Sequence, residues 1–216
     1  MISKWINTFI QSHLFLAISA YFFSIGILNQ NDLSVHFSVA LSLAVFGVYN
    51  SNRLNKSNNN KLPIETRFWY EKNAIILYST APVCLLMSAL IYIYLLRQET
   101  LTLFIFGLTV LITALYIFTI KQLNLRKIPC TKAIWISIIW TIIAVVIPKL
   151  ILGSFCWFNL HYLILFYALT IPGDMRDMEF DNPKMKTIPQ LIGNQKSQIL
   201  FYLLLVIFLM FNYLLE

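Results

Sequence analysis

Seven long hydrophobic runs, separated by short polar segments, constrain what this chain can fold into. Each run approaches the roughly 20 residues that an α-helix needs to cross a bilayer. Lipid offers no partner to unpaired backbone groups, so we expect every run to be helical. The sequence therefore predicts an all-α, polytopic transmembrane helical bundle, one domain over residues 1–216, with about seven spans near 9–28, 33–50, 73–96, 100–120, 132–152, 157–173 and 197–215.

The composition indicates a membrane protein and argues against nucleic-acid binding. Hydrophobic residues make up 59% of the chain and charged residues 12%, whereas soluble domains average roughly 45–50% and about 25%. The net charge of +7 is explained by basic residues that flank membrane spans. The three cysteines, Cys84, Cys130 and Cys156, are scattered, so they indicate neither a disulfide framework nor a metal site.

Lys and Arg residues gather on one side of the predicted bundle. Fourteen of the 16 lie in or directly beside the N-terminal segment and the loops 51–72, 121–131 and 174–196, and only Arg97 and Lys149 fall on the other side. Cytoplasmic loops carry an excess of Lys and Arg. We therefore expect an integral protein of the cell (plasma or inner) membrane, surrounded by the lipid bilayer, with its N-terminus and these loops in the cytoplasm.

The last of these loops concentrates the negative charge. Four of the nine acidic residues, Asp174, Asp177, Glu179 and Asp181, lie within the nine letters "GDMRDMEFD". On a helix, the three aspartates would share one face, and like charges there favour a bound cation. Oxygen ligands without His or Cys suit Mg²⁺. The alternative is a solvated loop whose charges bind nothing.

Basic residues are mixed into the same loop. Arg176, Lys184 and Lys186 stand among or just after the acids. Mg²⁺ in proteins is usually held by one or two carboxylates, with substrate phosphates and water completing its shell. This combination of charges therefore fits a phosphorylated substrate bound through Mg²⁺.

The loop also resembles the second aspartate-rich motif of the UbiA-type intramembrane prenyltransferases. That motif reads approximately N-x-R-D-x-x-x-D, followed by K-T-[LI]-P/A-x-x-x-G. The stretches "RDMEFD" and "KTIPQLIG" match it in order and spacing, and Asp174 stands where the family often has Asn. The segment "ALYIFTIKQLNLRKIPCTKAIWISIIW" (114–140) is similar to the family's entry into its fifth helix. The resemblance extends from the second span to the seventh.

This resemblance implies a helical bundle around a cavity, in which Mg²⁺ holds a polyprenyl diphosphate and the prenyl group passes to an apolar or aromatic acceptor. It implies that Asp177 and Asp181 are catalytic metal ligands and that Asp174 is a third ligand. Arg176 and Lys186 are the candidates in this loop for binding phosphate oxygens.

The chain departs from the family in its first aspartate-rich motif. In the best register, the three motif positions are Val48, Asn52 and Lys56, and the chain has no acidic residue between Asp32 and Glu65. We hypothesise that Arg53 or Lys56 replaces one Mg²⁺ in neutralising the diphosphate, since both side chains bind phosphate. Asn50 and Asn52 either contact the diphosphate or simply end the second span.

The sequence leaves two functions open. The chain is either an active prenyltransferase or a non-catalytic relative that binds a lipid or a protein partner. Family members usually have about nine spans, so a second copy in a homo-oligomer could supply the missing cavity wall. A transporter is disfavoured, because spans nearly free of charge do not suit coupled ion transport.

Overall fold

The computed structural model describes residues 2–28, 32–58, 62–117, 131–180 and 186–215. Every regular element in these ranges is a helix, which confirms the predicted all-α class. The chain divides into two compact units, Met1–Thr100 and Leu101–Glu216, and each is described by itself. The single domain over residues 1–216 stays a prediction.

Within the described ranges, four helices are long and apolar enough to cross a membrane. They are α3 (Asp32–Asn58), α5 (Ala74–Leu96), the continuous run Lys132–Ile151, and α11 (Asn194–Leu215). The helix α2 (Leu14–Ile27) and the apolar part of α6 (Thr100–Ile117) are shorter. The helices thus suit a membrane-embedded chain, whereas seven crossings stay a prediction.

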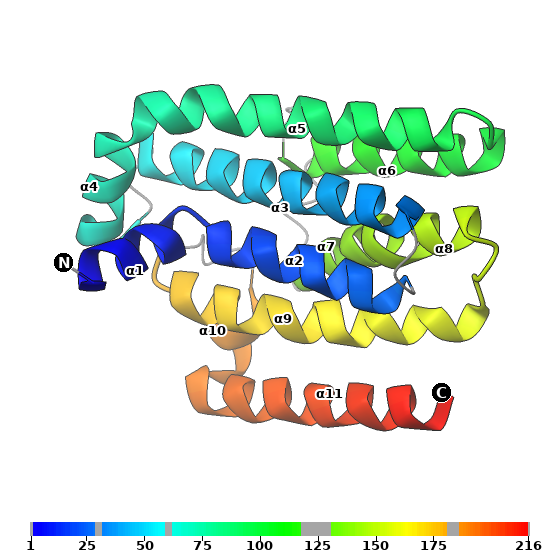
Figure 1. The fold of residues 1–216 in the computed structure, drawn as a ribbon. Coiled ribbons are helices and arrows are strands. Elements are labelled where there is room, and N and C mark those ends of the chain that lie inside the picture. The colour runs from blue at the N-terminus through cyan, green and yellow to red at the C-terminus, as the bar shows by residue number, and fades with distance from the viewer. Residues whose placement is uncertain (1, 29–31, 59–61, 118–130, 181–185, 216) are drawn as a thin grey trace. The chain divides into compact units, whose positions relative to one another are not determined.

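In unit 1, α3 packs against both α2 and α5 (Figure 1). Gly47 permits the close approach of α3 to α5, because a Cβ atom there would lie 2.5 Å from Leu85 Cγ and 2.9 Å from the Ala81 carbonyl oxygen. The Ser88 hydroxyl of α5 donates a hydrogen bond to the Ala40 carbonyl of α3 at 2.7 Å. These contacts join the two long helices along their length.

The first predicted span, near residues 9–28, is not one continuous helix. The chain forms α1 (Ile2–Gln11) and α2, with a break at Ser12 and His13. His13 adopts a left-handed backbone with φ +57°, which is uncommon for a residue other than glycine. The ring of His13 packs against Tyr49 of α3, with 5.3 Å between the ring centroids.

The helix that corresponds to the second predicted span is longer than the hydrophobic run near residues 33–50. The helix α3 does not end at Asn50 or Asn52 but continues to Asn58, so the interpretation of these residues as helix terminators is wrong. The last turns remain helical although Asn and Ser are weak helix formers. Burial on α3 explains this, because Arg53, Leu54 and Ser57 are all buried.

In unit 2, α9 (Tyr162–Asp177) packs against α7 (Lys132–Thr141) and α11. A π-helical turn (Ile142–Val146) links α7 to α8 (Ile147–Ile151). Pro148 explains this turn, because proline has no N–H for the Ala144 carbonyl and its ring crowds that carbonyl. The 3₁₀ turn η3 (Trp157–His161) precedes α9, and α10 (Ile188–Ile192) precedes α11.

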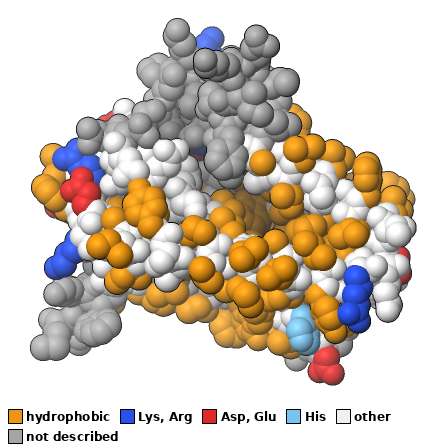
Figure 2. Space-filling model, turned by 90° about the horizontal axis from the view of Figure 1, so that it is seen from above, with side chains coloured by type: hydrophobic (Ala, Val, Ile, Leu, Met, Phe, Trp, Pro, Cys, Tyr) orange, Lys and Arg blue, Asp and Glu red, His pale blue; other side chains and the backbone are white. Residues whose placement is uncertain are grey.

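Apolar side chains cover much of the surface. In the apolar window of α11, only 6% of the residues are buried. Figure 2, which looks from above Figure 1 and so does not show α11, has many hydrophobic side chains on its described surface, with charged groups mainly at the edges. Lipid is the solvent that such a surface fits.

Candidate functional site

The candidate site lies at the C-terminal end of α9. Asp174 and Asp177 stand one turn apart on this helix, and both are buried, with 3% and 8% of their surfaces exposed. The predicted shared helical face therefore holds for these two. The helix ends at Asp177 and a turn follows over residues 178–180, so the predicted helix does not continue toward residue 181. Asp181 itself lies outside the described residues.

The position of these two carboxylates calls for positive charge. The carbonyl end of a helix carries about half a negative charge, so two aspartates there are electrostatically unfavourable on their own. Lys132, the first residue of α7, places its Nζ 2.6 Å from Asp174 Oδ1. The Nε of Arg176 donates to Asp177 Oδ1 at 3.1 Å. Each aspartate therefore has a basic partner.

Sequence analysis missed Lys132 as part of this site, because its position fits the excess of basic residues beside cytoplasmic loops. A signal was nevertheless present. Among the 16 basic residues, only Lys132 and Lys149 fall inside the predicted spans. A charge in a span is costly and usually pairs with another group, and the acids of residues 174–181 lie on the predicted cytoplasmic side with Lys132.

The segment after the site is fixed by its own helix-starting and helix-ending residues. The Thr187 N–H donates to Gln190 Oε1 at 3.0 Å, and Gln190 Nε2 donates to the Met178 carbonyl at 3.3 Å. Pro189 lies in the first turn of α10, where proline is well tolerated. Gly193 ends α10 with φ +79°. The stretch "KTIPQLIG" therefore holds the chain against the end of α9.

The predicted diphosphate contacts differ in their environments. The Arg176 side chain is 56% exposed, and Lys186 is exposed with φ +47°. In unit 1, Asn52 is exposed on α3, whereas Arg53 and Lys56 are buried. These three residues and the aspartates belong to different units, so their common role stays a prediction. Lys184 lies outside the described residues.

A second buried polar cluster lies in unit 1, where α1 gives way to α2; we call Gln11, Ser12, Asn50 and Tyr70 the α1–α2 junction. The Asn50 amide donates to the carbonyls of Ser12 (2.8 Å) and Phe46 (2.9 Å). The Tyr70 hydroxyl of α4 (Ile64–Lys72) donates to the Gln11 carbonyl at 2.7 Å and lies 3.4 Å from Asn50 Oδ1. Burial raises the pKa of Tyr70 above its usual value.

This junction assigns a structural role to Asn50. A helix break leaves carbonyls without their intrahelical donors, and the buried Asn50 and Tyr70 supply replacements. The prediction that Asn50 ends the second span is wrong, and its amide hydrogens are engaged within the fold.

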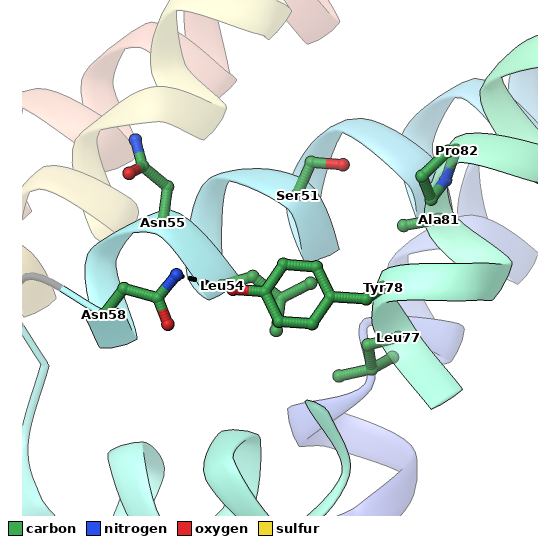
Figure 3. A pocket seen from close by; sticks show the side chains of 8 residues that line it. All are labelled: Ser51, Leu54, Asn55, Asn58, Leu77, Tyr78, Ala81 and Pro82. Carbon is green, nitrogen blue, oxygen red and sulfur yellow. Dashed lines mark hydrogen bonds between the residues drawn. The ribbon is translucent and has the colours of Figure 1, made fainter. Parts of the chain in front are cut away.

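A shallow pocket opens in unit 1 between α3 and α5, with a volume of about 240 Å³. Figure 3 shows its lining side chains, with the Tyr78 hydroxyl accepting a hydrogen bond from the Asn58 amide. The lining is neutral and comes from two helices: Ser51, Leu54, Asn55 and Asn58 of α3, and Leu77, Tyr78, Ala81 and Pro82 of α5. A neutral lining does not suit a diphosphate, so the charged end of α9 is the stronger candidate.

The donor set at the end of α9 can be compared with the needs of Mg²⁺. Within the described part of the chain, no group of three or more His, Cys, Asp or Glu side chains could hold a metal ion. Mg²⁺ needs only one or two carboxylates when phosphates and water complete its shell. The buried oxygens of Asp174 and Asp177 therefore fit an ion that a phosphorylated ligand helps to bind.

Comparisons with protein-family models, with curated proteins and with solved structures give no match for this chain.

Proposed function

We propose that the C-terminal end of α9 binds a polyprenyl diphosphate through Mg²⁺, and that the protein transfers the prenyl group to an apolar or aromatic acceptor in the membrane. The observation that carries this proposal is the pair of buried carboxylates, Asp174 and Asp177, beside the basic residues Lys132 and Arg176. The UbiA-like sequence pattern supports the same function. In this proposal the protein has about seven spans, and the site lies on their cytoplasmic side.

The chain's own residues have distinct roles in this proposal. Asp177 and Asp181 would hold the metal with Asp174 as a third ligand, and Arg176 and Lys186 would bind phosphate oxygens. When bound, Mg²⁺ stabilises the negative charge that develops on the departing diphosphate. The protein fixes the donor's diphosphate at the membrane boundary and leaves its apolar tail in lipid, so the reacting carbon stays away from water.

A non-catalytic binding protein is the second candidate. The observation that favours it is the missing carboxylate in the first motif region, where Val48, Asn52 and Lys56 occupy the motif positions. Such a protein would bind a lipid or a protein partner without prenyl transfer. Dependence on Mg²⁺ separates the two functions, because diphosphate binding through a metal requires the ion.

The experiment measures binding of a non-hydrolysable prenyl thiodiphosphate to the purified protein in lipid nanodiscs, with Mg²⁺ or with EDTA. We expect binding with Mg²⁺ that EDTA abolishes, and loss of binding in Asp177→Asn and Asp181→Asn. Asp32→Asn is the matched control, because Asp32 is an exposed residue at the start of α3. Binding that ignores EDTA and both site variants would refute the metal–diphosphate site.

A further inference from the structure

The first helix, α1, differs from the apolar helices of unit 1 in its sequence pattern. Its letters "ISKWINTFIQ" place the five apolar residues on one side of a helical wheel and the five polar residues on the other. The following helix α2, with the letters "LFLAISAYFFSIGI", is apolar almost all round. An all-round apolar helix suits a membrane span, whereas a two-sided helix suits the boundary between lipid and water.

The apolar side of α1 is exposed. Ile6, Phe9 and Ile10, at the helical spacing i, i+3, i+4, expose 53%, 37% and 57% of their surfaces. Ser12 and His13, directly after the helix, are buried. A surface helix of a globular protein turns its apolar stripe toward the core. The stripe of α1 instead faces out of unit 1, so it fits an apolar surrounding other than the protein core.

The α1–α2 junction fixes α1 where α2 begins. The last turn of α1 is tied to α4 and α3, because Tyr70 donates to the Gln11 carbonyl and Asn50 to the Ser12 carbonyl. Figure 1 shows α1 beside α4 at one end of unit 1, off the line of α2. The 14 residues of α2 rise about 21 Å, less than the roughly 30 Å of hydrocarbon in a bilayer. A helix about 10 Å wide lying against the start of α2 accounts for the remaining depth.

Lipid is the occupant that continuity favours for the exposed side of α1. The Phe9 ring lies edge-on against Phe15 of α2, with 6.2 Å between the ring centroids. Phe15, Ile18 and Phe22 form the exposed apolar side of α2, and such a surface fits lipid. The apolar side of α1 therefore extends the surface that α2 offers to lipid.

We propose that α1 lies in the headgroup boundary of one leaflet, the cytoplasmic one in the predicted orientation, with Ile6, Phe9 and Ile10 inserted among the lipid chains. This inference goes beyond the proposed function and stands without it. Lys4 is the one charged side chain in the sequence of α1. Apolar burial therefore drives the docking, and anionic lipids are not needed for it.

The experiment measures the depth of α1 by fluorescence quenching in phosphatidylcholine vesicles. A fluorophore is attached to Ile6→Cys or Ile10→Cys in a protein whose native cysteines are replaced by serine. We expect a nitroxide on the lipid headgroup to quench both labels at least about twofold more than a nitroxide deep in the acyl chain. Phe22→Cys, also exposed but in the middle of α2, is the matched control and should show the reverse preference.

Two kinds of result would overturn the proposal. Labels at positions 6 and 10 that neither nitroxide quenches would exclude lipid contact; quenching by aqueous iodide would then place this side in water, and protection from iodide would place it against protein, such as a second copy of the chain. A preference for the deep nitroxide would show that α1 continues the span. Adding 30% phosphatidylglycerol should leave the quenching ratios unchanged, and a docking that requires it would contradict the apolar driving force.

Discussion

The two buried polar clusters of this protein differ in the kind of group that satisfies them. At the α1–α2 junction, the neutral side chains of Asn50 and Tyr70 donate to backbone carbonyls. At the end of α9, ionised side chains pair with each other, as Lys132 does with Asp174. The hydrogen-bonding groups of the junction are satisfied within the fold, whereas the charged groups at the end of α9 can attract a charged ligand. The junction is therefore scaffold, and the end of α9 is the candidate binding site.

The largest expected effect comes from breaking the buried ion pair. Lys132→Met should destabilise the protein by about 3–5 kcal/mol, because it leaves the Asp174 charge buried without its ammonium. The double variant Lys132→Met/Asp174→Leu should recover most of this loss. Chemical unfolding in detergent measures both, with the exposed Lys196→Met as control. A single variant as stable as the wild type would show that the pair does not stabilise unit 2.

The second prediction concerns a substitution that disrupts the α1–α2 junction. Asn50→Leu should cost about 1–3 kcal/mol, because it leaves the Ser12 carbonyl without the Asn50 donor in a buried site. The matched control is Asn52→Leu on the same helix, where the side chain is exposed, and it should change stability by less than about 0.5 kcal/mol. Equal effects in the same unfolding assay would contradict the structural role of Asn50.

A smaller effect is expected for Tyr70→Phe, which removes only one donor. The loss of the hydrogen bond to the Gln11 carbonyl should cost about 0.5–1.5 kcal/mol. Tyr78→Phe removes a hydroxyl that also takes part in a hydrogen bond but is exposed, so it should cost less. If the thermal unfolding of the two variants is the same, burial at the junction does not strengthen this bond.

The smallest effect is a pH dependence to which Tyr70 of the junction contributes. Burial raises the pKa of Tyr70 in the folded protein, while an unfolded tyrosine titrates near pH 10. Above pH 10 the unfolded chain therefore holds fewer protons than the folded chain, and stability falls as the pH rises. Between pH 9 and 11, the unfolding midpoint of Tyr70→Phe should fall less than that of the wild type. Parallel declines would contradict this.

The positions of most helices could be predicted from the sequence, because hydrophobic runs in lipid leave the backbone little choice. The break between α1 and α2 could not. No Gly or Pro marks Ser12 and His13, and the groups that stabilise the break, Asn50 and Tyr70, come from distant parts of the chain. The extension of α3 to Asn58 was also missed, because burial outweighs the weak helix propensity of its last residues.

The aspartates and Arg176 of the site could be predicted from the concentration of charge in one loop, whereas Lys132 could not. Asp174 and Asp177 lie together because they are one turn apart on α9. The pairing of Asp174 with Lys132 joins residues 42 positions apart in the sequence, and only the packing of α7 against α9 creates it. Spacing alone therefore identifies neighbours along one helix but not partners across helices.

Thermal unfolding with and without ligand tests the difference between scaffold and site most directly. The wild type, Asp177→Asn and Asn50→Leu are compared with Mg²⁺ and a prenyl thiodiphosphate at about 100 times its Kd, where a ligand adds about 2.7 kcal/mol of stability. We expect Asp177→Asn to unfold like the ligand-free wild type but to gain nothing from ligand, and Asn50→Leu to unfold earlier but to keep the full gain. A full gain in Asp177→Asn, or its loss in Asn50→Leu, would contradict the assignment.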